Sequence, residues 1–300
     1  MRKNSLIAFL FFGNYFYGIC AVALSMETAL VLNFPLQDFF YYLFIFATTT
    51  FFYTIAYLSE PINQHNPRTI WYVEHKKLVR YTQCFLFLMV VFLLLIYLFS
   101  HFKKIIFLEW EAILLMALFP FVAMAYYGAN STFFSTKNIR QIGWLKPCVI
   151  GFVWAGTTII YPFFYEKINN PTFFCEQSSV FNLFLENTMF ITVLGIMFDI
   201  KDYAADSNEK IKTFVVQHGL RKTIFHIIFP LTFIGWALRF RHFFDSPIAV
   251  SKVFLQAIPY LLLLTMAYSL RQRKSILYYL ILVDGLILIK VFCTWLEKII

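Results

Sequence analysis

The feature that most constrains the fold is a series of apolar segments, each long enough to cross a bilayer. We expect nine of them in the sequence, of about 20 residues each, because a helix needs that length to span the hydrocarbon core. A segment in lipid must satisfy its own backbone hydrogen bonds, so all are predicted to be helices. Their approximate ranges are 5–26, 36–58, 82–100, 105–126, 146–164, 180–198, 223–240, 250–269 and 276–295. The sequence therefore predicts an all-α integral membrane protein with a single polytopic domain over residues 1–300.

The composition agrees with this class of protein. Apolar residues make up 60% of the chain and charged residues only 14%, whereas about a quarter of a soluble domain is charged. No polar stretch is long enough to form a separate soluble domain. The five cysteines include no CxxC pair, so neither a disulfide framework nor a zinc site is indicated.

The net charge of +9 raises the question of a nucleic-acid partner. Most of the 25 lysine and arginine residues lie, however, in alternate loops, on the same side as the N-terminus. This is the distribution that the positive-inside rule gives for cytoplasmic loops. We therefore expect a lipid bilayer and no nucleic acid as partner, with a cytoplasmic N-terminus. The loops predicted to be cytoplasmic are about 59–81, 127–145, 199–222 and 270–275.

One of these loops begins with an unusual acidic pattern at the end of an apolar helix. Asp199, Asp202 and Asp206 are spaced i, i+3 and i+7, which places them within an arc of roughly 60° on one helix face. Like charges on one face repel unless a cation lies between them. Carboxylate oxygens with room for water suit Mg²⁺ bound through substrate phosphates. The alternative interpretation is a solvated acidic cluster at the membrane surface.

Basic residues near this pattern are candidates to bind an anion. Lys210 and Lys212 follow the aspartates directly, and point charges of this sign suit pyrophosphate oxygens. Arg68 lies in the loop after the second apolar segment, where it either meets the same pyrophosphate or contacts lipid headgroups.

The segment 195–219, GIMFDIKDYAADSNEKIKTFVVQHG, resembles the second aspartate motif of the UbiA superfamily of intramembrane prenyltransferases. The resemblance implies nine helices around a central cavity, Mg²⁺ bound by the three aspartates, and a polyprenyl diphosphate as substrate. It implies transfer of the prenyl group to a small acceptor, often an aromatic quinone precursor. It also implies that a basic residue after the fourth helix, Arg140 or Lys146, lies near the phosphates.

The chain departs from the family pattern after its second apolar segment. The family carries a first motif there, roughly N-D-x-x-D, whereas in this chain the corresponding stretch, 53–61, has Glu60 as its only acid. Three functions therefore remain open. A Mg²⁺-dependent prenyltransferase is the first, a catalytically degenerate UbiA-like protein with a binding or structural role is the second, and a transporter is the least favoured.

Polar residues inside apolar segments are also candidates for function. We expect Asn14 to hydrogen-bond to another helix or to line the cavity. Asp284 should face the bundle interior, either in a structural polar contact or in the cavity. Glu186 is expected near the outer end of its segment, in contact with headgroups or water. It lies 13 residues before Asp199, or about 20 Å along a helix, and so outside the aspartate site.

Overall fold

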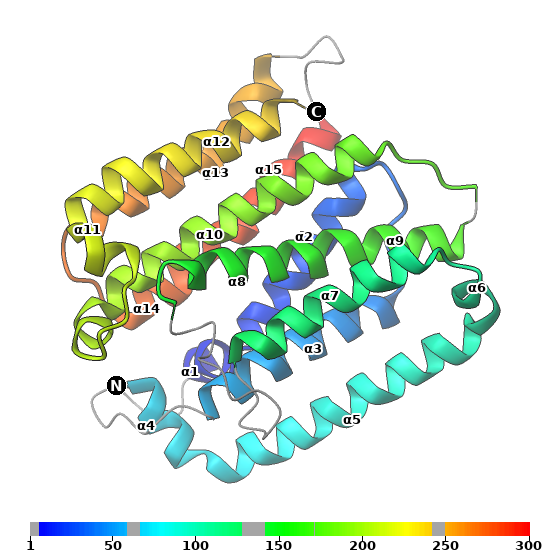
Figure 1. Ribbon diagram of the computed structural model, residues 1–300, viewed down its shortest axis with the longest axis horizontal. Helices are drawn as coiled ribbons and strands as arrows, with labels where there is room; N and C mark the ends of the chain where they lie inside the picture. The colour runs from blue at the N-terminus through cyan, green and yellow to red at the C-terminus, as the bar shows by residue number, and fades with distance from the viewer. Residues whose placement is uncertain (1–5, 59–66, 128–141, 171, 242–249) are drawn as a thin grey trace.

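The computed structural model describes residues 6–58, 67–127, 142–170, 172–241 and 250–300, and within these ranges every regular element is a helix (Figure 1). In chain order the elements, with π-helical turns labelled η, are α1 (Leu6–Phe12), α2 (Tyr15–Val31), α3 (Phe39–Leu58), α4 (Pro67–Glu74), α5 (Lys76–Ser100), α6 (Phe102–Ile106), α7 (Trp110–Tyr127), α8 (Leu145–Ala155), η2 (Gly156–Ile160), α9 (Tyr161–Asn169), α10 (Gln177–Asn208), α11 (Phe214–Lys222), η3 (Thr223–Ile228), α12 (Phe229–Arg241), α13 (Val250–Ser269), α14 (Ile276–Tyr278), η4 (Tyr279–Val283) and α15 (Gly285–Ile299).

The predicted membrane fold is confirmed, although the number of spans is approximate. Six helical segments of the described chain are long and apolar enough to cross a bilayer, and the bent pair α1 and α2 makes a seventh. Two shorter apolar helices, Phe39–Ile55 and Trp110–Tyr126, lie where the sequence predicts two further spans. The protein is therefore an all-α integral membrane protein, and its apolar helices occur at the positions expected from the sequence.

The helices differ greatly in how much of their surface the bundle covers. In the apolar 18-residue stretch of α10, 61% is buried inside the bundle, whereas in the corresponding stretch of α5 only 11% is buried. Figure 1 shows α10 between α8 and α12, and α5 along the edge of the molecule. A helix that is apolar all round and covered by neighbours belongs to the core, and one that exposes large apolar side chains faces lipid. Side chains on α10 are therefore the best placed to form an interior site.

The first predicted span is broken at Asn14. The backbone of Asn14 adopts the left-handed conformation (φ 65°), which asparagine tolerates better than most residues, and α1 and α2 meet there at 64°. The fully buried Asn14 amide donates hydrogen bonds to the Thr54 hydroxyl on α3 at 3.0 Å and to the Tyr72 hydroxyl on α4 at 2.9 Å. The predicted hydrogen bond from Asn14 to another helix is thus confirmed.

Two glycines allow α8 to approach α10 closely. A Cβ atom on Gly151 would lie 2.4 Å from the Thr192 hydroxyl oxygen of α10. A Cβ atom on Gly143 would lie 2.4 Å from the carbonyl carbon of Lys212, in the turn that follows α10. Both distances are shorter than any side chain tolerates, so these contacts require glycine. They fix the beginning of α8 beside the last turns of α10.

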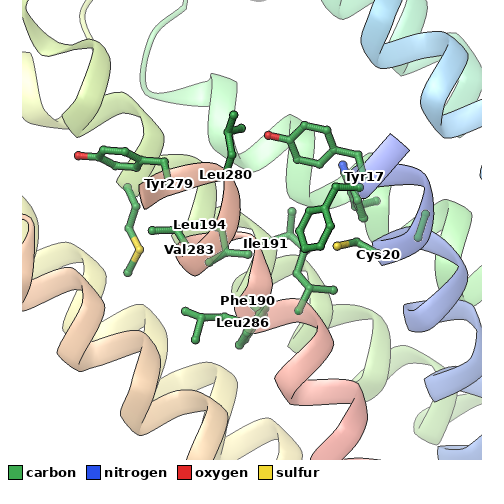
Figure 2. Packing of buried hydrophobic residues seen from close by; sticks show 14 of the residues in the cluster. Tyr17, Cys20, Phe190, Ile191, Leu194, Tyr279, Leu280, Val283 and Leu286 are labelled. Atoms are coloured by element: carbon green, nitrogen blue, oxygen red, sulfur yellow. The ribbon is translucent and has the colours of Figure 1, made fainter. Parts of the chain in front are cut away.

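Apolar packing fills the centre of the bundle between α2, α10 and the last helix (Figure 2). The labelled side chains are Tyr17 and Cys20 of α2, Phe190, Ile191 and Leu194 of α10, Tyr279, Leu280 and Val283 of η4, and Leu286 of α15. Along α10 this apolar part lies between Glu186 and Asp199. It therefore separates two polar regions of the same helix.

Candidate functional site: an acidic cluster at the end of α10

Asp199 is the most deeply buried of the three predicted aspartates. Its side chain is fully buried, and its Oδ1 atom accepts a hydrogen bond from the Lys146 ammonium of α8 at 2.8 Å. Its Oδ2 atom has no hydrogen-bond partner among the residues that the structure describes. Buried polar atoms are nearly always hydrogen-bonded, so an exception in a candidate site calls for an explanation. A ligand that offers a cation or a donor would supply the missing partner.

The other two aspartates complete a group that we call the acidic cluster: Asp199, Asp202 and Asp206 with Lys146 and Lys201. Asp206 is buried, and its charge acts on Lys146 together with that of Asp199. The Asp202 side chain is 42% exposed and lies 3.2 Å from the Lys201 ammonium. The five charges sum to −1, so the cluster has less positive than negative charge.

Lys210 and Lys212 lie in the turn after α10 and are both exposed. Lys210 has a positive φ of 57°, and the Ile211 amide donates to the Asp206 carbonyl at 2.8 Å, so the turn folds back on the end of the helix. Within the described ranges neither lysine forms an ion pair. Both side chains are therefore accessible to an anion from outside the bundle.

Arg68 lies in a second polar group, the central polar cluster, with Asn14, Thr54 and Tyr72. Its guanidinium donates to the side-chain amide oxygen Oδ1 of Asn14, and only 2% of the residue is exposed. Its charge also acts on Asp284, which is buried and hydrogen-bonded to a tyrosine of α2. Arg68 is therefore a buried partner of α2 and not a headgroup contact. Arg140, the remaining predicted anion ligand, falls outside the described residues.

The residues present fit Mg²⁺ in one specific way. No group of three or more acidic, histidine or cysteine side chains in the described part of the chain is close enough to enclose a metal ion. Mg²⁺ is usually held by one or two carboxylates, with water and substrate phosphates as its other ligands. The unpartnered Asp199 Oδ2 and the half-exposed Asp202 suit such a site. The acidic cluster thus fits a metal ion that arrives with a phosphate ligand.

A third polar region, which we call the buried ion network, consists of Glu27, Glu186, Arg239 and Lys290. The Lys290 ammonium lies 2.6 Å from Glu27 Oε2 and 3.2 Å from Glu186 Oε1. The Arg239 guanidinium lies 3.4 Å from Glu186 Oε2 and 3.6 Å from Glu27 Oε1. All four side chains are at most 3% exposed. The network joins α2, α10, α12 and α15.

The buried ion network corrects the expectation for Glu186. This residue was expected to contact headgroups or water, but it is fully buried. Its Oε1 atom also accepts a hydrogen bond from the Tyr260 hydroxyl at 2.5 Å. The reason is that α12 and α15 place Arg239 and Lys290 beside Glu186 inside the bundle. The signal in the sequence was four charged residues in or beside apolar segments, a costly placement unless the charges pair.

Comparisons with known proteins bear on the fold. No protein-family model matches the chain, and no curated protein matches it. A solved structure of a digeranylgeranylglyceryl phosphate synthase, described as acting in membranes, matches over 100% of this chain and 99% of that chain, with a TM-score of 0.58 and 13% sequence identity. Identity at this level shows a shared fold. The chain therefore shares its overall helical fold with this membrane synthase, over its whole length.

Proposed function

We propose that this protein is a membrane prenyltransferase, which moves a polyprenyl group from its diphosphate to an acceptor. The observation that carries the proposal is the fold shared over the whole chain with a synthase whose product bears geranylgeranyl groups. The acidic cluster supports it, because the predicted acidic motif and Lys146 come together at the end of α10. The cluster has a net negative charge and lies at the end of a membrane helix. A metal ion bound there suits a substrate that has a diphosphate head and an apolar chain.

The residues of the chain have distinct roles in this reaction. The bond between the prenyl C1 atom and the diphosphate oxygen breaks, and its electron pair leaves with pyrophosphate. Lys146, Lys210 and Lys212 stabilise the negative charge that grows on the leaving group. Asp199 holds Lys146 in place through the 2.8 Å contact. The acceptor forms a new bond to C1 and loses a proton.

Asp199, Asp202 and Asp206 would hold Mg²⁺, directly or through water. When bound, the metal neutralises diphosphate charge as the bond to C1 breaks. In the proposed orientation the acidic cluster faces the cytoplasm, because the loops around it carry most of the basic residues.

The acceptor is proposed at the level of two classes. The resemblance to the UbiA superfamily favours an aromatic quinone precursor. The name of the synthase with the similar structure instead indicates a glyceryl phosphate lipid. Both classes offer a nucleophile that carries a removable proton, as the reaction requires.

A UbiA-like protein that binds a prenyl diphosphate without transferring it is the second candidate. The family's first acidic motif is missing from the sequence, because the stretch 53–61 at the end of the second apolar segment contains Glu60 as its only acid. The Arg68 guanidinium, also after the second apolar segment, is paired with Asn14 in the interior. Carboxylates from one acidic motif would hold Mg²⁺ more weakly than carboxylates from two motifs.

Release of pyrophosphate tests the choice between these candidates. Purified protein in nanodiscs would receive geranylgeranyl diphosphate and Mg²⁺, with 4-hydroxybenzoate or a geranylgeranylglyceryl phosphate as acceptor. We expect release that depends on an acceptor and is lost in Asp199→Asn. Glu209→Gln is the matched control, because Glu209 is an exposed acid three residues beyond Asp206. Tight binding of the diphosphate without release for any acceptor would favour the binding protein instead.

A further inference from the structure

The ends of α11 and α13 come together in a surface that is rich in basic residues. The Phe225 ring of η3 contacts the Tyr268 ring near the end of α13, with the ring centroids 6.3 Å apart. Figure 1 shows α12 and α13 side by side, with α11 at the end where α13 leads toward α14. The contact therefore brings two sets of cations to one end of the bundle. We call them the basic surface: Arg221 and Lys222 of α11, with Arg271, Arg273 and Lys274 after α13.

The cations of the basic surface have no acidic partner among the residues that the structure describes. None of the five forms an ion pair there, and the segments 214–241 and 250–283 contain neither aspartate nor glutamate. Four of the five side chains are exposed, and that of Lys274 is half-exposed. Since no described carboxylate neutralises it, this positive charge attracts an anion from outside the protein.

Tyrosine rings position two of these cations. The Arg271 guanidinium lies 4.9 Å from the centre of the Tyr268 ring and donates a hydrogen bond to the Tyr268 hydroxyl at 2.7 Å. The Lys274 ammonium lies 5.3 Å from the centre of the Tyr278 ring. Contact with an aromatic face orients a cation without cancelling its charge, and Arg271 keeps most of its N–H groups for other acceptors. Both side chains are thus able to bind phosphate oxygens.

The turn that carries these two cations is fixed by hydrogen bonds at its base. The Ser269 and Tyr278 hydroxyl oxygens lie 2.6 Å apart, and the Ser275 hydroxyl accepts a hydrogen bond from the Tyr278 amide at 3.3 Å. Tyr278 therefore ties the start of α14 to the last turn of α13. A site that is ordered in advance loses less conformational entropy when a ligand binds.

An exposed face of α13 leads up to the basic surface. Phe254, Ile258 and Leu261 are 70%, 41% and 57% exposed. Thr265 and Tyr268 continue the same face, because positions three or four apart lie on one side of a helix. From Phe254 to Tyr268 the face is about 21 Å long, more than half of a hydrocarbon core of about 30 Å. A lipid acyl chain can therefore lie along this face with its headgroup at the basic surface.

We propose that the basic surface binds the phosphate of an anionic phospholipid, such as phosphatidylglycerol, whose acyl chain lies along the exposed face of α13. The apolar face favours a lipid over a free phosphate, which has no chain to cover it. Tyr268 and Tyr278 suit this place, because tyrosine is enriched where a membrane protein meets the headgroups. The inference does not depend on prenyl transfer, and it makes the charge of the surrounding lipid a determinant of stability.

Lipid titrations followed by native mass spectrometry test the site. Dioleoyl phosphatidylglycerol and dioleoyl phosphatidylcholine, which have the same chains, would be added separately to the protein in dodecyl maltoside. We expect the anionic lipid to bind at least about tenfold more tightly, and Arg271→Gln with Lys274→Gln to remove most of this preference. Lys76→Gln with Lys77→Gln is the matched control, because these exposed lysines begin α5 on the same predicted side of the membrane. It should keep the preference.

Thermal unfolding provides a second readout. A ligand that binds only the folded state stabilises it, so phosphatidylglycerol should raise the unfolding temperature of the wild type by about 2–5 °C relative to phosphatidylcholine. Tyr268→Leu keeps all five cations and removes the ring beside Arg271, and it should lose most of this shift. Tyr81→Leu is the control, because Tyr81 is 73% exposed near the start of α5. It should show the full shift.

Three results would overturn the inference. The first is equal affinity of the wild type for the two lipids. The second is an equal loss of preference in the Lys76 and Lys77 double variant, which would reduce the basic surface to a general attraction between cations and headgroups. The third is displacement of phosphatidylglycerol by an equal concentration of glycerol 3-phosphate, which would assign the surface to a free phosphate. No prenyl diphosphate enters these experiments, so the proposed function stands or falls separately.

Discussion

The acidic cluster and the buried ion network lie on the same helix, 13 residues apart on α10, and both contain a lysine–carboxylate pair. In the network two acids face two bases, and each charged group has at least two partners within 4 Å. In the acidic cluster one buried carboxylate oxygen has no partner among the described residues, and acids outnumber bases. A closed set of charges stabilises a fold, whereas an open set can bind a ligand. We therefore assign the network to stability and the cluster to binding.

The largest effect that this comparison predicts is on stability, from the network. Lys290→Met removes one cation and leaves Glu27 and Glu186 with Arg239 alone. Loss of one partner from a buried pair costs about 3–5 kcal/mol, so we expect a corresponding fall in the free energy of unfolding. Thermal and denaturant unfolding in detergent would measure it. Folded Lys290→Met protein should still bind geranylgeranyl diphosphate as the wild type does.

Two variants sharpen this test. Lys298→Met removes an exposed lysine of the same helix, whose ammonium donates a hydrogen bond to Asn33, and should change stability by less than about 1 kcal/mol. Glu27→Leu with Lys290→Leu removes an opposite pair, and we expect a coupling energy of about 1–3 kcal/mol between the two changes. Equal stability of Lys290→Met and Lys298→Met would contradict a structural role for the network.

The second effect is on binding, from the acidic cluster. Asp199→Asn keeps the shape of the side chain and removes its charge, so it weakens the contact to Lys146 and any contact to a cation. A hydrogen bond to a charged group contributes about 1.5–3 kcal/mol, so affinity for geranylgeranyl diphosphate with Mg²⁺ should fall roughly 10- to 100-fold. Calorimetry would show it. If Asp199→Asn lowered the free energy of unfolding as much as Lys290→Met and still bound the diphosphate normally, the acidic cluster would have a structural role. That result would contradict its assignment to binding.

The smallest effect is expected at Asp202. Its side chain is 42% exposed beside Lys201, and exposed pairs contribute about 0–1 kcal/mol to stability. Asp202→Asn should therefore unfold at nearly the wild-type temperature and bind the diphosphate about fivefold more weakly, which corresponds to about 1 kcal/mol. A large loss of stability would show that Asp202 belongs to a closed network, contrary to its exposure.

The sequence predicted the class of the fold and the position of the acidic cluster. Bilayer-length apolar segments dictate helices, and the i, i+3, i+7 spacing places Asp199, Asp202 and Asp206 on one face of α10. The contact between Lys146 and Asp199 depends on how α8 packs on α10. That packing, with its close approach at Gly151, comes from the three-dimensional structure and not from the spacing of residues in the sequence.

The break at Asn14 and the buried ion network could not be predicted, because they depend on contacts between distant parts of the chain. The break at Asn14 has no proline to signal it, and the residue lies inside an apolar run. Glu27 lies just beyond the first predicted segment, whereas α2 continues to Val31. Its pairing with Lys290 joins residues 263 positions apart. The sequence places the end of each span only to within a few residues, so it does not show whether a charge near that end is buried.

A calorimetric titration of geranylgeranyl diphosphate into wild-type protein in nanodiscs, with Mg²⁺ and again with EDTA, tests the central claim most directly. The same titration would follow for Asp199→Asn and Glu209→Gln. Our account predicts binding that requires Mg²⁺, that is lost or greatly weakened in Asp199→Asn, and that is unchanged in Glu209→Gln. Absence of binding to folded wild-type protein, or equal affinity in Asp199→Asn, would contradict the assignment of the acidic cluster as a diphosphate site.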